Sequence, residues 1–182
     1  LLTHSPRWLR AIYPRLYEFL VRHLPFGWAM GYWLLDHPWV FRLCQPWRRR
    51  WNLLVAMRFL RWVQTLGPDV MVVTHFFSAD VLGAAKQRGW LDAPLVVMIT
   101  DLWPHRLWLA PEAEAVAVGS DDTRALCLQR GVVPERLTVV GIPIAEPFGR
   151  PADRAAIARS LGLEAGRKTV LVASGGMGVG PI

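Results

Sequence analysis

Short apolar runs alternate with helix-like segments from residue 66 onwards, and this alternation is the strongest constraint on the fold. The apolar runs, which are rich in β-branched residues, are residues 69–74, 95–100, 115–118, 137–140 and 169–173. The helices expected between them are residues 78–88 with Ser78 as N-cap, a segment from Ser120 to Gly131, and residues 152–161 closed by Gly162. Continuous apolar strands separated by helices are typical of a parallel sheet covered on both faces. We therefore predict an α/β fold.

In parallel sheets of this kind, ligands bind beyond the carboxyl ends of the strands. That rule selects four places in the sequence: His75, residues 101–108, residues 141–143 and residues 174–180. We expect the functional residues among them.

The last of these places is glycine-rich and directly follows the expected strand 169–173. Its glycines are Gly175, Gly176, Gly178 and Gly180. Glycines let backbone amides approach a phosphate closely, so this loop is a candidate phosphate-binding site. A tight strand-to-helix turn without a ligand is the alternative interpretation.

Residues 101–108 carry an acid, an imidazole and two indoles beyond a strand end, with Asp101 and His105 as the titratable groups. Such a segment could bind a polar group, orient a base, or contact a sugar or an acyl chain. The alternative is an aspartate that caps the loop and a histidine on a solvated surface, and His75 has the same two interpretations. No metal site is expected, because neither histidine has metal-ligand spacing and the chain has only two cysteines.

Positive charge and aromatic residues concentrate in the first third of the chain. Residues 1–65 hold ten arginines against two acids, Glu18 and Asp36, whereas the remainder holds eleven basic residues against twelve acids. Seven of the ten tryptophans lie in the same third. Residues 8–24 place apolar and aromatic side chains on one half of a helix and charges on the other.

A helix with an apolar face on one side and arginines on the other is typical of segments that bind in the headgroup zone of an anionic membrane. The residues expected to contact the membrane or a lipid acceptor are Trp8, Arg15, Trp47, Arg48, Arg49, Trp51 and His75. No stretch is long and apolar enough for a membrane span. Two alternative interpretations stay open at this point. The amphipathic helix could instead pack on the rest of its own protein, or the basic surface could bind nucleic acid. The high content of apolar residues and the lack of lysine-rich or RGG-type runs argue against nucleic acid.

An ordered series of short motifs resembles the monogalactosyldiacylglycerol synthases and the processive diacylglycerol glucosyltransferases, which are GT-B glycosyltransferases related to MurG. The motifs are residues 13–17, 67–70 with 74–75, 99–102 with His105 and Trp108, 118–121, 141–144 with Phe148, and 170–172 with 175–182. The resemblance implies a Rossmann-like acceptor domain and a second domain that binds a nucleotide-sugar. The shift in charge and aromatic content marks a boundary near residues 66–68. The expected domain limits are 1–66 for a basic, tryptophan-rich helical membrane or acceptor segment, 67–144 for the acceptor-domain core and, by the resemblance, 145–182 for a linker with the first strand and glycine-rich loop of the donor domain.

By this resemblance the chain transfers a sugar, from a donor expected to be UDP-linked, to a lipid such as diacylglycerol. No metal or other cofactor is implied, and neither is a nucleic-acid partner. Asp101 and His105 match the family motif at the cleft edge, and Gly175 to Gly180 would lie near the diphosphate. The family's favoured catalytic base, a histidine in an N-terminal glycine-rich stretch, has no counterpart here. We therefore expect a fragment that is inactive alone and a peripheral location on the cytoplasmic side of a membrane. The alternative function is a non-catalytic membrane- or protein-binding module.

Overall fold

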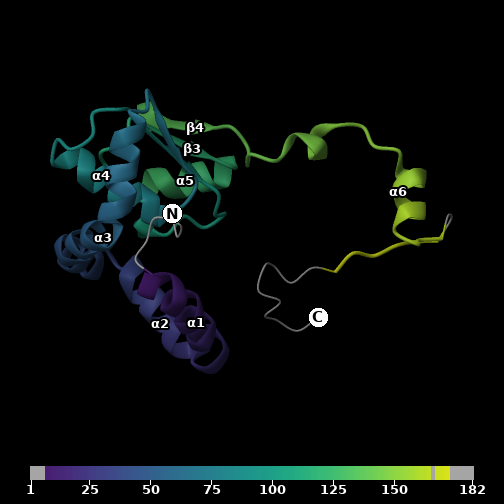
Figure 1. Cartoon of the computed structure of the whole chain (residues 1–182), viewed down its shortest axis with the longest axis horizontal. Helices are drawn as coiled ribbons and strands as arrows, with labels where there is room; N and C mark the ends of the chain where they lie inside the picture. Colours follow the sequence, from purple (N-terminus) through teal and green to yellow (C-terminus); the bar gives the residue numbers. More distant parts are fainter. Residues whose placement is uncertain (1–6, 165–166, 173–182) are drawn as a thin grey trace. The chain divides into compact units, whose positions relative to one another are not determined.

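The computed structural model describes residues 7–164 and 167–172, and it divides into two compact units, Leu1–Ile142 and Pro143–Ile182. Figure 1 shows the elements along the chain. The helices of the first unit are α1 (Arg7–His23), α2 (Pro25–Asp36), α3 (Pro38–Leu66), α4 (Phe76–Gln87) and α5 (Asp121–Gln129), with short 3-10 turns η2 (Arg106–Trp108) and η3 (Pro134–Arg136). Its strands are β1 (Met71–Val73), β2 (Leu95–Ile99), β3 (Ala115–Val118) and β4 (Leu137–Val139).

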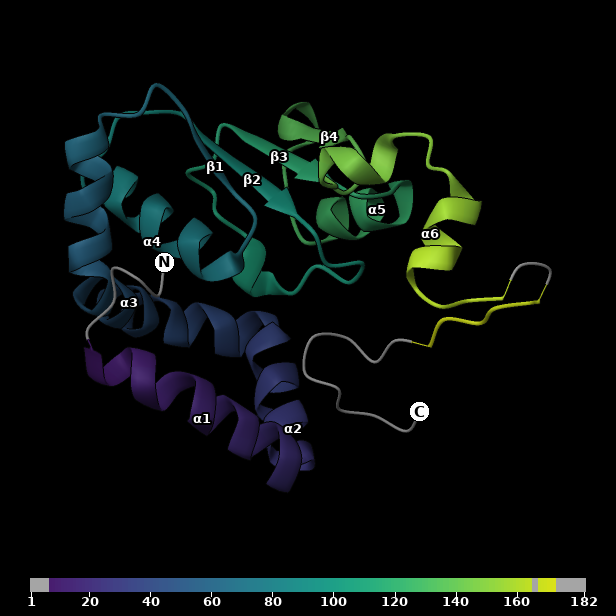
Figure 2. The same cartoon turned by 45° about the vertical axis from the view of Figure 1, so that its right-hand side comes forward.

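The four strands form one parallel sheet in the order β1-β2-β3-β4, as the apolar runs predict. The inward-facing side chains, such as Leu95, Val97 and Val118, are fully buried. Both α4 and α5 lie on this same side of the sheet (Figure 2). Consecutive strands joined by right-handed crossovers place every connection on one face.

The prediction of a sheet covered on both faces is met in part: the connecting helices lie on one face, and Met98 of the inner strand β2, which points to the other face, is 3% exposed. On the opposite face of the sheet, Val72 of the edge strand β1 is 63% exposed.

The helix boundaries follow local capping chemistry. Gly67 ends α3 in the left-handed conformation at φ 53°, which glycine adopts readily. Ser120, the first residue of the segment expected to be helical, caps α5, since its side chain accepts a hydrogen bond from the Thr123 N–H. Ser78 is not the N-cap of α4: the helix begins at Phe76 because the His75 imidazole takes the capping role.

The long helix α3 has apolar residues on two sides. Its inner side packs against α4 through residues such as Leu53, Ala56 and Phe59. Its outer side carries a row at spacings of three and four residues, which we call the α3 outer stripe: Trp39, Leu43, Trp47, Trp51 and Leu54, all between 61% and 76% exposed. A helix that is apolar on both sides is normally buried on both sides.

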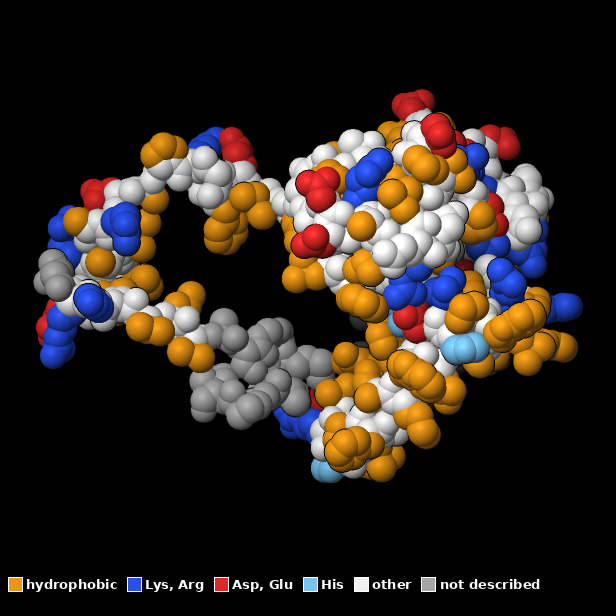
Figure 3. All heavy atoms as spheres, turned by 180° about the vertical axis from the view of Figure 1, so that it is seen from behind, with side chains coloured by type: hydrophobic (Ala, Val, Ile, Leu, Met, Phe, Trp, Pro, Cys, Tyr) orange, Lys and Arg blue, Asp and Glu red, His pale blue; other side chains and the backbone are white. Residues whose placement is uncertain are grey.

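Hydrophobic side chains also remain exposed on α1 and α2, including Phe19, Phe26 and Trp33. Figure 3 shows hydrophobic side chains gathered over this helical part of the first unit. The two helices meet through Tyr17 and Trp28, whose rings pack edge to face with centroids 5.1 Å apart. Within the described residues, no helix combines the length and the hydropathy required to cross a bilayer.

The second unit contains η4 (Glu146–Gly149) and α6 (Arg154–Ser160), where Asp153 caps α6 and Gly162 follows it at φ 69°. The predicted strand at 169–173 is not formed over its described residues 169–172. Val170, Leu171 and Val172 are 82%, 90% and 62% exposed. A strand needs a hydrogen-bonding neighbour, and the described part of this unit contains no other strand.

Candidate functional site

The candidate site lies at the carboxyl edge of the sheet, where the ends of β1 and β2 bring His75 and Asp101 into one neighbourhood. His75 follows β1, and its Nδ1 accepts a hydrogen bond from the Phe77 N–H at 3.1 Å. The imidazole stacks on Phe76 with ring centroids 4.5 Å apart. Desolvation lowers the pKa of His75, and the Asp101 carboxylate only partly offsets this effect. His75 is therefore a neutral imidazole near pH 7 whose Nε2 is the nitrogen that can face a ligand.

Asp101 is exposed to solvent, and a hydrogen bond from the buried indole of Trp108 fixes the orientation of its carboxylate. The Nε1–H of Trp108 donates to Asp101 Oδ2 at 2.7 Å, while the Trp108 side chain is almost fully buried. The second carboxylate oxygen can therefore accept a hydrogen bond from solvent or a ligand. This arrangement is compatible with orienting a hydroxyl group or a neighbouring base.

His105 is buried rather than solvated, and both of its ring nitrogens are engaged. Nε2 lies 2.8 Å from the Tyr32 carbonyl oxygen, and Nδ1 accepts from the Leu107 N–H at 3.0 Å. Because a carbonyl only accepts hydrogen bonds, Nε2 carries the proton and the ring is neutral. Burial lowers the pKa of His105, in the direction that favours this form. The structure thus gives His105 a positioning role, in which it ties α2 to the loop after β2.

Sequence reasoning missed a second cluster that fixes the same loop. Asp36, the last residue of α2, accepts from both terminal nitrogens of Arg130 at 2.6 and 2.8 Å and from the Arg106 N–H at 2.8 Å. Arg106 Nε in turn donates to the Asp36 carbonyl oxygen. The signal in the sequence was the rarity of acids in the first third of the chain, since an isolated acid among arginines is a natural ion-pair partner.

The predicted membrane-contact residues divide into two groups. Trp47 and Trp51 are 75% and 61% exposed on the α3 outer stripe, and Arg15 is exposed on α1. Arg49 is 7% exposed, and Arg48 forms an ion pair with the buried Asp80 at 2.8 Å. Arg48 and Arg49 therefore point into the protein, and we remove them from the proposed membrane-contact set.

Several predicted residues cannot be placed. Trp8 belongs to α1, but its side chain is outside the described part of the structure. The proposed phosphate-binding glycines, Gly175, Gly176, Gly178 and Gly180, also lie outside the described residues. Over residues 7–164 and 167–172, no group of three or more His, Cys, Asp or Glu side chains could hold a metal ion.

A four-stranded parallel sheet with polar residues at its carboxyl edge defines a Rossmann-like domain, consistent with the N-terminal half of a GT-B glycosyltransferase. The family model described as monogalactosyldiacylglycerol (MGDG) synthase matches residues 1–144. The chain belongs to this family.

Curated relatives share modest identity with the chain. A processive diacylglycerol beta-glucosyltransferase of Staphylococcus epidermidis is 27% identical over 112 residues, covering 62% of this chain and 28% of the relative. The corresponding protein of Bacillus pumilus is 24% identical over 135 residues, covering 72% and 35%. A probable monogalactosyldiacylglycerol synthase, chloroplastic, of Nicotiana tabacum is 27% identical over 187 residues, covering 98% and 33%. The chain thus spans 28% to 35% of the length of these relatives.

The Asp36 cluster predicts a specific loss of stability in acid. Burial opposes ionisation of Asp36, but the hydrogen bonds from Arg130 and Arg106 outweigh it and lower its pKa. A carboxylate with a lowered folded pKa stabilises the fold above its unfolded pKa of about 3.9 and loses that contribution as pH falls through the folded pKa. We expect Asp36→Asn to lower the free energy of unfolding by about 2 kcal/mol at pH 7 and by much less at pH 2. Urea denaturation across this pH range measures the difference, and an equal loss at both pH values would contradict an ion-pair role.

Proposed function

We propose that this chain is the acceptor-side part of a glycosyltransferase that moves a sugar from a nucleotide-sugar, UDP-linked in our proposal, to a diacylglycerol-type lipid. The match of residues 1–144 to the MGDG synthase family carries this proposal. The relatives' names, which specify diacylglycerol glucosyltransferase and MGDG synthase, support the lipid acceptor. The exposed residues Asp101 and His75 at the carboxyl edge are compatible with it.

In this proposal, the chain's own residues bind and orient the acceptor. The lipid hydroxyl attacks the anomeric carbon of the sugar, loses its proton to a base, and expels the nucleoside diphosphate. Asp101, held by Trp108, accepts a hydrogen bond from the acceptor hydroxyl or from the base. His105 and Tyr32 fix the position of the loop that carries Asp101. The chain spans 28% to 35% of the length of the relatives, and in this proposal the base and most of the donor site come from a protein of the relatives' full length, so we expect the 182 residues alone to be inactive.

Contact with the membrane surface is the second part of the proposal. The α3 outer stripe and the exposed side chains of α1 and α2 form an apolar surface rich in tryptophan. A large exposed apolar surface marks a site of contact with a membrane or a partner. Its tryptophans and the nearby exposed arginines, such as Arg15 and Arg50, suit the interface of an anionic bilayer. We place the protein peripherally, on the cytoplasmic side of a membrane.

The test is sugar transfer by a protein that carries this segment and has the length of the relatives. The assay measures transfer of radiolabelled glucose or galactose from the UDP-sugar into chloroform-extractable lipid, with vesicles containing diacylglycerol as acceptor. We expect labelled glycolipid with at least one of the two donors. We also expect Asp101→Asn to reduce transfer at least tenfold while vesicle binding is unchanged.

Asp92→Asn is the matched control, because Asp92 is an exposed aspartate in the loop between α4 and β2, away from the carboxyl edge. Its transfer rate should equal that of the wild type. Vesicle binding without transfer from either donor would instead support the alternative function, a non-catalytic membrane-binding module. An active Asp101→Asn enzyme would remove Asp101 from the site.

A further inference from the structure

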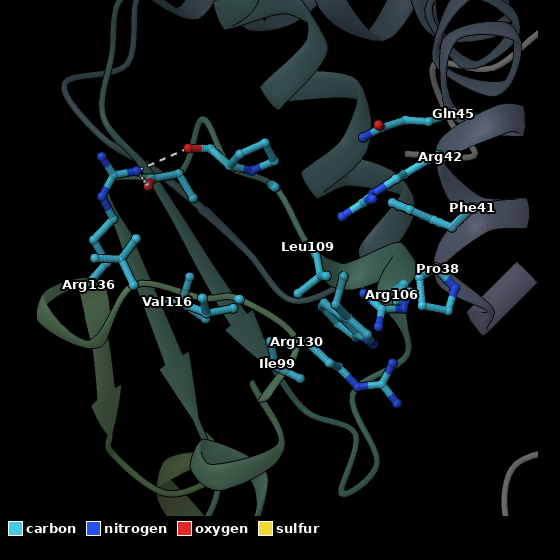
Figure 4. Close-up of a pocket in the computed structure, with 17 residues that line it drawn as sticks. Pro38, Phe41, Arg42, Gln45, Ile99, Arg106, Leu109, Val116, Arg130 and Arg136 are labelled. Carbon is cyan, nitrogen blue, oxygen red and sulfur yellow. Dashed lines mark hydrogen bonds between the residues drawn. The ribbon is translucent and has the colours of Figure 1, made fainter. Parts of the chain in front are cut away.

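A pocket of about 310 Å³ lies in the first unit, and neither Asp101 nor His75 is among the residues that line it. The start of α3 forms one wall, through Phe41 and Arg42, and the loop after η2 forms another. Ile99 and Val116 contribute from the strands β2 and β3. Figure 4 shows Arg42, Arg106 and Arg130 on one side of this pocket and Arg136 on the other, with Leu109, Ile99 and Val116 between them. The walls between the arginines are thus apolar.

The charges around this pocket are unbalanced. Four arginines line it, and no aspartate or glutamate does. The Asp36 carboxylate neutralises Arg130, and Arg136 donates to the carbonyl oxygens of Pro111 and Ala113.

Arg42 and Arg106 form no ion pair with a carboxylate among the described residues. Arg42 lies over the ring of Trp39 at 5.9 Å, and Arg106 uses Nε to reach a backbone carbonyl. The terminal nitrogens of these two guanidinium groups are therefore the donors that can bind an anion at the pocket.

We propose that this pocket binds a single-chain anionic amphiphile of the fatty-acid class. Its carboxylate would lie against Arg42 and Arg106, and its hydrocarbon chain would run over Leu109 and Val116. Charge complementarity selects the anionic head, because guanidinium groups bind carboxylates with paired hydrogen bonds. The volume is at the lower end of the range for ligand pockets, about 300–1,000 Å³, so it suits one chain and not a diacyl lipid.

This inference does not depend on the proposed sugar transfer. Trp108 forms part of the pocket wall and also donates to Asp101. The pocket and the candidate site therefore share one side chain, through which an occupant can influence the position of Asp101.

The test is isothermal titration of the full chain with decanoate in vesicle-free buffer, below the concentration at which decanoate forms micelles. We expect saturable binding of one decanoate per chain. Arg42→Gln should weaken that binding about tenfold or more, as expected for the loss of a charge-assisted hydrogen bond. Val133→Trp, which fills the pocket from a 48% exposed position, should abolish it with the melting temperature unchanged.

Arg61→Gln is the matched control, since Arg61 is exposed on the same helix and does not line the pocket. Its decanoate affinity should equal that of the wild type. The proposal is overturned if Arg42→Gln binds decanoate as tightly as the wild type or if the neutral analogue decanol binds equally well. It is also overturned if inorganic phosphate displaces decanoate, which indicates a simple anion site, or if binding occurs only to vesicles containing anionic phospholipid, which indicates a membrane lipid.

Discussion

Replacing Arg49 by methionine is expected to lower the free energy of unfolding by about 3–5 kcal/mol, the largest effect of any single substitution considered for this chain. Arg49 is 7% exposed at the centre of α3. Its Nε donates to Asp80 Oδ1 at 3.2 Å, and its two terminal nitrogens donate to the carboxylate oxygens of Glu112 at 2.6 and 2.9 Å. Methionine leaves the Glu112 carboxylate without its counter-ion, and it leaves Asp80 with Arg48 as its remaining ion-pair partner, in a region largely removed from water.

The pKa shifts of Arg49 and Glu112 also indicate that the two groups stabilise each other's charged form. Burial opposes the charge on Arg49, but the hydrogen bonds and charges of Glu112 and Asp80 outweigh it and raise its pKa. Burial likewise opposes ionisation of Glu112, and Arg49 outweighs it and lowers the pKa of that carboxyl. Both groups are thus charged near pH 7 and depend on each other for that state. The network joins α3 to α4 and to the loop after η2, so its loss loosens the attachment of α3 to the sheet domain.

Urea denaturation followed by circular dichroism measures this effect. Arg50→Met is the matched control, since Arg50 is the next residue of the helix and is exposed; it should change stability by less than about 0.5 kcal/mol. The double variant Arg49→Met with Glu112→Met should recover part of the loss, because apolar groups then replace both charges of the pair. If the Arg49→Met variant were as stable as the wild type, the network would contribute nothing to the free energy of unfolding.

Replacing Trp47 and Trp51 together by serine is expected to weaken binding to anionic vesicles about a hundredfold. Each exposed indole that enters the headgroup zone contributes about 1.5 kcal/mol or more, and two together correspond to roughly two orders of magnitude in affinity. Both side chains belong to the α3 outer stripe and make no part of the buried core, so the fold should persist.

Co-sedimentation with vesicles of defined anionic lipid content measures the affinity, and the far-ultraviolet circular dichroism spectrum checks the fold. Trp90→Ser is the control, because Trp90 is a 43% exposed tryptophan in the loop after α4 and not on α1, α2 or α3. It should bind vesicles like the wild type. If the double variant also bound normally, the α3 outer stripe would not be the membrane-contact surface.

The order and type of the main elements of the first unit could be predicted from the sequence. Buried parallel strands are marked by continuous apolar runs, and all four runs of the first unit became strands. Capping at Ser120 and the stop at Gly67 are local chemistry, so they too could be read from neighbouring residues. The predicted fifth strand failed because a strand exists only with a partner, and the apolar run at 169–172 has none in the described residues.

The roles of individual side chains could be predicted less well. His105 and His75 look alike in the sequence, since each follows a strand in an aromatic context. One is buried between Tyr32 and Leu107, and the other caps a helix at the surface. Asp36 and Arg130 are 94 residues apart, and no sequence pattern links them.

The sequence by itself determined the α/β class, the strand order along the chain and the concentration of arginine and tryptophan in the first third. Only the tertiary structure decided which of those residues face outward. The segment from Trp47 to Trp51 is the clearest case: Trp47 and Trp51 are exposed, while Arg49 between them is buried. Consecutive residues of a helix point about 100° apart. The rotation of α3 about its axis, set by packing on α4 and by the carboxylates of Asp80 and Glu112, therefore sorts neighbouring residues into surface and interior.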